Sequence, residues 1–256
     1  MNKEDFHLLD DQPVSLKKAD KLHFTRYLEV IKKYLLKRKE TTPFVFGIYG
    51  KWGTGKTTLL EMLAEKLKED EKWITIKFSP WMYRNEKSLL LPLLATISKK
   101  TPAFEKLVKK IISDGPAFIK TLSSMGLETA TTGLPLLTFL QSIKKKSKTE
   151  EAKDLAEKIE NAVKEATKNG KKKMVFLIDD LDRCHDPLQI INLLEQIKIF
   201  LHLDHCLFVL SMDKDQVITA VEEKFPKEGA SYLDKFVQLD FELPPTSPTI
   251  FLKWQV

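Results

Sequence analysis

A glycine-rich stretch, Gly50-Lys-Trp-Gly-Thr-Gly-Lys-Thr57, constrains the fold more than any other part of the sequence. Its spacing is G-x-x-x-x-G-K-[ST], in which glycines allow backbone N–H groups to surround phosphate oxygens. Residues 44–49 before it are mostly apolar, aromatic or β-branched, as in a buried strand. Residues 58–67 after it carry apolar side chains at helical spacing. The order of strand, glycine-rich turn and helix therefore predicts a phosphate-binding loop in an α/β sheet.

The chemistry of this loop predicts a nucleoside triphosphate with Mg²⁺ as its ligand. The start of the following helix adds partial positive charge. Lys56 is placed to reach the β- and γ-phosphates, and the Thr57 hydroxyl is placed to hold Mg²⁺. ATP is the expected substrate, although nothing in the loop separates ATP from GTP. The residues predicted to bind the nucleotide are Gly50, Trp52, Gly53, Thr54, Gly55, Lys56, Thr57 and Thr58.

The composition is typical of one large intracellular domain. With 256 residues and 43% hydrophobic content, the chain can bury one α/β core with little left for a second. Two cysteines, Cys184 and Cys206, make no disulfide framework, which favours a reducing compartment. The first residues lack the apolar core of a signal peptide, and no window reaches the roughly 18 apolar residues of a membrane span. We therefore expect a cytoplasmic protein, with peripheral attachment to the inner face of the membrane as the alternative.

Five short apolar runs predict the strands of a mainly parallel sheet. They cover residues 44–49, 73–78, 174–178, 206–211 and 237–241. Helical patterns separate most of them; after the third run, apolar side chains recur at helical spacing from Leu188 to Leu201. Alternating strands and helices predict helices on both faces of the sheet, and hence a three-layer α/β architecture.

The long interval 88–172, between the second and third runs, predicts a helical insertion. Residues 89–97 form a helical pattern that Pro92 starts or kinks, and 148–168 predict an amphipathic helix. The middle, 115–143, is rich in Thr, Ser, Gly and Leu, and three lysines follow it. We favour a pair of helices packed on the sheet there, because its apolar runs are short and broken. The alternative is that 115–146 contacts a membrane surface through those lysines.

Two consecutive carboxylates follow the third predicted strand, at the edge where parallel sheets bind ligands. Asp179 is expected to hold Mg²⁺, and Asp180 is expected to orient or deprotonate the attacking water. Arg183 is either a catalytic arginine that stabilises phosphoryl charge or the ion-pair partner of a nearby acid. Asp182 is a further acid of the site or the N-cap of the next helix. Because the acids come as a pair, we expect hydrolysis, with Lys56, Asp180 and Arg183 as the catalytic residues.

Other polar residues carry weaker signals. Asp213 follows the fourth predicted strand and is either a sensor of the γ-phosphate or a helix N-cap. Cys184-His185 and His202-x-x-His205-Cys206 match no standard zinc spacing, so no zinc site is expected. The short lysine runs 144–146 and 171–173 are not interleaved with aromatic residues, so nucleic acid is not an expected partner.

Several of these motifs together resemble the KAP family of P-loop NTPases. They are Trp52 inside the loop, the turn Phe78-Ser-Pro-Trp81, the run Ile178-Asp-Asp-Leu-Asp-Arg-Cys184, and Phe236-Val-Gln-Leu-Asp-Phe-Glu-Leu-Pro-Pro245. The resemblance implies a sheet of strand order 5-1-4-3-2 and an insertion that in the family often contains transmembrane helices. It also implies a lead-in segment with a helix, here 1–42. The whole chain, 1–256, is then one such domain, with a C-terminal lid that is cut short.

The resemblance and the paired acids lead to one expected function and three alternatives. We expect a molecular switch that binds and hydrolyses Mg·ATP, and the phage-excluding members of the family imply a setting in bacterial defence. The alternatives are a nucleotide-gated scaffold with negligible turnover, a membrane-associated NTPase and a small-molecule kinase. The kinase lacks support in the sequence, which has no arginine-rich lid or acceptor-binding arginine cluster. Self-association stays open.

Overall fold

Five parallel strands form one sheet at the centre of the computed structural model, which describes residues 24–37, 43–83, 89–113, 150–184, 187–200 and 203–244. The strand order is β2-β3-β4-β1-β5, which confirms the predicted order 5-1-4-3-2 read from the other edge. The strands are β1 (Phe44–Tyr49), β2 (Trp73–Phe78), β3 (Lys173–Ile178), β4 (Cys206–Met212) and β5 (Leu239–Glu242).

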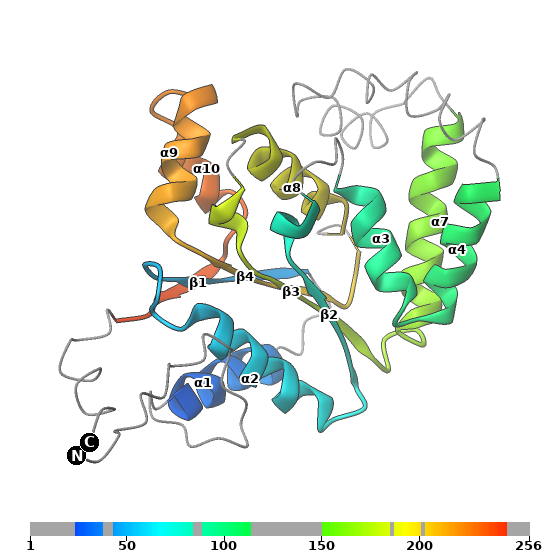
Figure 1. Cartoon of the computed structure of the whole chain (residues 1–256). Helices are drawn as coiled ribbons and strands as arrows, with labels where there is room; N and C mark the ends of the chain where they lie inside the picture. Colours follow the sequence, from blue (N-terminus) through cyan, green and yellow to red (C-terminus); the bar gives the residue numbers. More distant parts are fainter. Residues whose placement is uncertain are drawn as a thin grey trace, which may run out of the picture.

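Helices cover both faces of the sheet, which explains why the central strands are apolar at nearly every position (Figure 1). In β1, consecutive side chains divide between the two faces. Phe46 and Ile48 belong to the core beside α1 (Phe24–Lys37) and α2 (Lys56–Lys68), whereas Val45 belongs to the core on the opposite face. All residues of β1 are buried. The predicted three-layer architecture is therefore confirmed.

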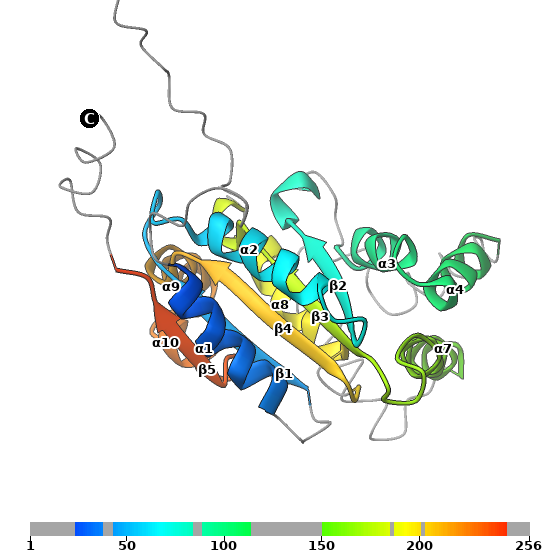
Figure 2. The same cartoon turned by 90° about the horizontal axis from the view of Figure 1, so that it is seen from below.

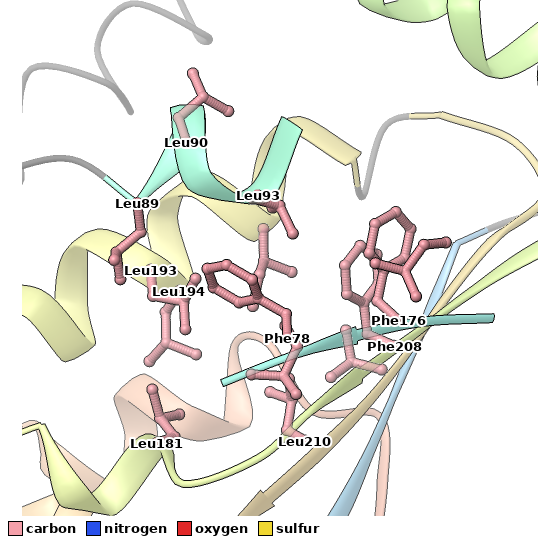
Figure 3. Packing of buried hydrophobic residues seen from close by; sticks show 14 of the residues in the cluster. Phe78, Leu89, Leu90, Leu93, Phe176, Leu181, Leu193, Leu194, Phe208 and Leu210 are labelled. Atoms are coloured by element: carbon pink, nitrogen blue, oxygen red, sulfur yellow. The ribbon is translucent and has the colours of Figure 1, made fainter. Parts of the chain in front are cut away.

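The second face is covered by α8 (Pro187–Phe200), α9 (Lys214–Lys224) and α10 (Gly229–Asp234). At its centre, the rings of Phe176 on β3 and Phe208 on β4 stack with 4.5 Å between their centroids, and both residues are fully buried. Figure 3 shows this pair and the leucines of α8 that belong to the same cluster. Because β4 lies between β1 and β3, it forms the middle of the core.

The described part of the insertion consists of α3 (Leu90–Ser98), α4 (Pro102–Ser113) and α7 (Glu150–Ala166), which pack together beside β2 (Figure 2). α3 and α7 confirm the two helices predicted in this interval to within two residues at each end. Pro92 lies in the first turn of α3, where a backbone N–H has no helical partner to lose. The proline therefore starts the helix and does not kink it.

Some predictions fall outside the described residues. The segment 115–143, with its two alternatives of packed helices and membrane contact, is one of them, and the C-terminal lid is another. Of the lead-in 1–42, the structure describes α1. Within the described parts of the chain, no helix combines the length and apolar character needed to cross a bilayer. That residues 1–256 form a single domain stays a prediction.

The fifth strand begins later than predicted, at Leu239 rather than at position 237. Phe236 and Val237 both donate their backbone N–H groups to the Leu233 carbonyl, at 2.9 and 3.0 Å, and so belong to the turn that ends α10. Val237 packs against the core from this turn, which is why it resembles the first residue of a strand. Pairing with β1 begins only at Gln238, whose N–H donates to a β1 carbonyl at 3.1 Å.

Candidate nucleotide-binding site

The glycine-rich loop joins the end of β1 to the start of α2, at the carboxyl edge of the sheet (Figure 1). Gly53 and Gly55 have φ angles of 80° and 88°, in the left-handed region that glycine adopts without strain. Gly55 is the N-cap residue of α2, so the chain turns directly from the loop into the helix. The backbone shape of the loop therefore requires glycine at these two positions.

The Lys56 ammonium group lies inside the loop, where only 8% of the residue is exposed. Its Nζ donates to the carbonyl oxygens of Gly50 at 2.7 Å and of Lys51 at 3.1 Å. The Thr54 hydroxyl donates to the same Lys51 carbonyl at 2.8 Å. Through these bonds the loop backbone and the lysine side chain fix each other's position.

The first turn of α2 adds a second source of positive charge. The first hydrogen bond of this helix joins the Leu59 N–H to the Gly55 carbonyl at 2.9 Å. The N–H groups of Lys56, Thr57 and Thr58 precede that bond and have no acceptor within the helix. Gly55 has no side chain that could cap them, so their partial positive charge faces the loop. A helix start of this kind is suited to binding phosphate.

The carboxylates Asp179 and Asp180 lie at the same edge of the sheet as the loop, because β4 alone separates β1 from β3. The Asp179 N–H donates to the Phe78 carbonyl of β2 at 3.1 Å, which extends the sheet pairing one residue past β3. The Lys56 ammonium group is close enough to act electrostatically on the Asp180 carboxyl. The structure thus brings together the predicted phosphate-binding lysine and the predicted catalytic acid.

Asp180 combines an uncommon backbone conformation with a shifted proton affinity. Its φ of 57° and ψ of 32° lie in the left-handed region, which Asp tolerates better than most residues. Burial, and after it the negative charge of Asp179, raise the pKa of Asp180 above its usual range, against the opposing effect of Arg183. A carboxylate with a raised pKa is a better proton acceptor, as a general base requires.

Arg183 forms an ion pair with Asp180, in which Nε lies 2.7 Å from Oδ1. The structure therefore shows the ion-pair alternative, and a catalytic role for Arg183 stays a prediction. Asp182 lies inside the short 3-10 helix η3 (Leu181–Arg183), whereas α8 begins only at Pro187. The prediction that Asp182 could cap the following helix is wrong, because η3 intervenes between the two.

Asp179 and Thr57 are the residues predicted to hold Mg²⁺. The Oδ1 atom of Asp179 is buried and has no hydrogen-bond partner among the described residues, which suits an oxygen that a cation would complete. Thr57 lies half-buried in the first turn of α2. In the described ranges, no three His, Cys, Asp or Glu side chains gather into a metal cluster. One or two protein oxygens are nevertheless enough for a Mg²⁺ site, because this ion keeps several water ligands and also binds substrate phosphates.

Two polar residues lie at the end of β4, next to the loop. Asp213 is the N-cap of α9, because its carboxylate accepts the Asp215 N–H at 3.2 Å. The N-cap alternative is confirmed, and a role in sensing the γ-phosphate stays a prediction. Ser211, which sequence reasoning missed, is fully buried, and its Oγ has no hydrogen-bond partner in the described part of the chain. A single hydroxyl within an otherwise apolar strand is the signal that could have identified it.

Two tryptophans of the predicted motifs differ in exposure. Trp52, in the glycine-rich loop, is 80% exposed, so its indole is open to a ligand or a partner. Trp81 lies half-buried in the 3-10 helix η1 (Pro80–Tyr83), which follows β2. The partial burial of Trp81 agrees with a packing role, whereas nucleotide contact by Trp52 stays a prediction.

The strand order, the loop closed around a buried lysine and the paired acids beyond β3 define a P-loop NTPase domain. Residues 24–254 match the family described as the KAP family P-loop domain. The chain therefore belongs to the KAP family, as the resemblance of its motifs implies.

A curated relative is similar over most of this chain. The Phage T7 exclusion protein of Escherichia coli (strain K12) is 26% identical over 249 residues. That similarity covers 88% of this chain and 33% of the relative, so the chain spans about a third of the relative's length.

Two solved structures also cover most of the chain. Cdc6p from Pyrobaculum aerophilum has 11% identity and a TM-score of 0.47, covering 97% of this chain and 50% of Cdc6p. AMPPCP-bound DnaA from Aquifex aeolicus has 16% identity and a TM-score of 0.38, covering 91% of this chain and 51% of DnaA. At scores this low, the strand order itself describes the fold better than either likeness does.

Proposed function

We propose that this domain binds Mg·ATP and hydrolyses it, and that the cycle of binding and hydrolysis makes it a molecular switch. One observation carries the proposal: the buried Lys56 follows β1, and the acids Asp179 and Asp180 follow β3, at the same carboxyl edge of a sheet in which only β4 lies between these strands. The phosphate-binding and proton-accepting groups then lie at the same edge of the sheet, as phosphoryl transfer to water requires.

In this proposal, the loop binds and orients the triphosphate. Lys56 contacts the β- and γ-phosphates while its bonds to the Gly50 and Lys51 carbonyls keep the ammonium group in place. The free N–H groups at the start of α2 bind phosphate oxygens. Gly53 leaves space on the outside of the loop, because nothing lies within 4 Å of a Cβ built on it. Trp52, exposed beside it, contacts the nucleotide.

Thr57 and Asp179 would hold Mg²⁺ through the threonine hydroxyl and the carboxylate. The buried Oδ1 of Asp179, which lacks a hydrogen-bond partner among the described residues, supports this assignment. Bound Mg²⁺ would neutralise charge on the phosphate oxygens. The second acid, Asp180, accepts a proton from the attacking water at its carboxylate, and its raised pKa favours that transfer.

Phosphate release by the purified protein tests the proposal. With saturating Mg·ATP, wild type should release phosphate at a rate that Asp180→Asn lowers by about 10²–10⁴-fold, the usual contribution of a general base. Asp204→Asn is the matched control, because this exposed aspartate precedes β4 at the opposite edge of the sheet. If wild type releases phosphate no faster than Asp180→Asn, the hydrolytic assignment is wrong.

A second candidate function is a nucleotide-gated scaffold with negligible turnover. The ion pair between Arg183 Nε and Asp180 Oδ1, at 2.7 Å, favours it, because a carboxylate held by a guanidinium is a poorer base. The variant Arg183→Gln separates the two functions. A higher rate of phosphate release in this variant identifies Arg183 as a brake, whereas a lower rate identifies it as a catalytic arginine that serves the switch.

The setting of the switch is also a proposal. We propose a role in bacterial defence against phage, supported by the name of the Escherichia coli relative, which this chain matches over a third of that relative's length. Challenge of cells with and without the full gene by a panel of phages tests it, and equal plaque numbers would contradict it. We further propose a cytoplasmic location, in keeping with the two buried cysteines, Cys184 and Cys206, which are not joined in a disulfide. Cell fractionation tests this location.

A further inference from the structure

Lys51, the second residue of the glycine-rich loop, reaches across to the junction of β4 and α9. Its Nζ lies 3.3 Å from Asp213 Oδ1 and 2.5 Å from Asp215 Oδ2. Asp213 is the N-cap of α9 and Asp215 lies in the first turn of this helix. The side chain of Lys51 therefore joins the phosphate-binding loop to the start of a helix on the opposite face of the sheet.

The backbone of Lys51 is equally central to the loop. Its carbonyl oxygen accepts from three donors: the Thr54 N–H at 3.3 Å, the Thr54 hydroxyl at 2.8 Å and Lys56 Nζ at 3.1 Å. A displacement of Lys51 would disturb all three bonds together. The same residue thus holds the phosphate-binding lysine through its carbonyl and holds α9 through its ammonium group.

The two ion pairs differ in how strongly water screens them. The Lys51 side chain is 57% exposed and the Asp215 side chain is 74% exposed, so the shorter contact is screened on both sides. The Asp213 side chain is only 10% exposed, and its position is fixed further by the bond from the Asp215 N–H. The raised pKa of Lys51 and the lowered pKa of Asp215 agree in direction, since each charge stabilises the other.

We propose that Lys51 is a positioning residue, whose bridge to Asp213 and Asp215 keeps the loop in its phosphate-binding shape and couples nucleotide binding to the first turn of α9. The inference rests on the proposed binding of nucleotide. It makes the coupling reciprocal, because a bridge that favours nucleotide binding must be favoured by bound nucleotide to the same extent. The nucleotide signal then passes from the loop to α9, which packs against α8 and α10.

The dissociation constant of Mg·AMPPCP, measured by calorimetry, tests the bridge. Asp215→Asn should weaken binding about threefold, the size expected for a partly exposed ion pair, and Lys51→Gln, which removes both pairs, should weaken it at least as much. Asp213→Asn should do the same while keeping the N-cap of α9, because Asn caps as well as Asp. The double variant Lys51→Gln/Asp215→Asn should bind no more weakly than Lys51→Gln, because both acids act through the same lysine, and Lys51→Arg should retain wild-type affinity.

The matched control is Lys109→Gln on α4, which removes an exposed ion pair of similar length, 2.6 Å to Glu105, away from the loop. This control should leave the dissociation constant unchanged. If Asp215→Asn binds Mg·AMPPCP as tightly as wild type, or more tightly, the inference is overturned; tighter binding would mean that the acids withhold Lys51 from phosphate. If wild type itself fails to bind, the proposed function fails instead.

Hydrogen exchange supplies a readout that a purely structural role would not move. In wild type, Mg·AMPPCP should slow exchange of the amides in the first turn of α9, Asp215–Val217, by about the same threefold factor. In Lys51→Gln, saturated with the same ligand, this protection should disappear while protection at the start of α2 remains. Equal protection of α9 in wild type and Lys51→Gln would refute the coupling.

Discussion

Gly50→Ala is a sharp test of how the loop is packed. A Cβ at position 50 would lie 2.6 Å from the Thr54 hydroxyl oxygen and 3.3 Å from Leu243 Cβ. Thr54 cannot move away freely, because it is only 4% exposed and its hydroxyl donates to the Lys51 carbonyl at 2.8 Å. The new methyl group must therefore displace either the Gly50 backbone, and with it the carbonyl that accepts from Lys56, or the threonine side chain.

The magnitude follows from the two ways in which the clash can be relieved. Overpacking a tight site lowers the free energy of unfolding by about 1–3 kcal/mol, and breaking the threonine hydrogen bond alone costs about 0.5–1.5 kcal/mol. We expect a loss of about 2 kcal/mol, which for a domain of this size lowers the melting temperature by about 4–8 °C. Affinity for Mg·AMPPCP should fall as well, because the Gly50 carbonyl holds Lys56 Nζ at 2.7 Å.

The double variant Gly50→Ala/Thr54→Ala tests the cause of the clash, measured by calorimetric melting. Removing the hydroxyl leaves the milder contacts with Leu243 Cβ at 3.3 Å and Thr54 Cβ at 3.5 Å. Thr54→Ala should therefore cost about 1 kcal/mol less stability in the Gly50→Ala background than in wild type, where it only removes the hydrogen bond. Gly53→Ala is the control: its φ of 80° strains alanine by about 1–2 kcal/mol with no atom within 4 Å. If Thr54→Ala costs as much stability in Gly50→Ala as in wild type, or its cost falls equally in Gly53→Ala, the steric reasoning is refuted.

Two further predictions concern Asp180 and Trp52. Asp180→Asn should melt at a higher temperature than wild type at pH 7. Folding raises the pKa of Asp180, so the charged carboxylate destabilises the folded protein once the pH exceeds the pKa of the unfolded state, about 4. The advantage should vanish below about pH 4, where both states are protonated; a lower melting temperature at pH 7 would contradict the raised pKa. Trp52→Ala removes an indole that is 80% exposed, so stability should change by less than about 0.5 kcal/mol while affinity for Mg·AMPPCP falls. An unchanged affinity would remove Trp52 from the nucleotide site.

The central sheet could be predicted well because buried parallel strands leave a distinct record in the sequence. β1 and β2 have the predicted bounds, since β1 is buried throughout and polar or glycine residues follow each strand directly. The predicted start of β5 was two residues too early, because apolar residues also occur in the turn before this strand. Val237 packs against the core from a turn, and an apolar turn residue cannot be told from an apolar strand residue by pattern alone.

In the site, too, features that depend on neighbouring residues could be predicted, whereas contacts between residues far apart in the sequence could not. The loop from Gly50 to Thr57 was predictable because its shape depends on consecutive residues, two of them glycines with positive φ. The N-cap role of Asp213 and the partner of Arg183 were each one of two alternatives, because neighbouring residues allow several local hydrogen-bonding arrangements. The bridge from Lys51 to Asp215 was not predicted at all, since 164 residues separate its two ends.

The sequence by itself determined that this chain contains a phosphate-binding loop and a strand that ends in two acids, because each motif is written in adjacent residues. Only the tertiary structure decided which of these groups meet. Pairing of β4 between β1 and β3 brings Lys56 within electrostatic reach of Asp180 and places Lys51 against the start of α9. These contacts depend on the order of strands in the sheet, and parallel strands joined by long connections acquire that order only when the whole domain packs.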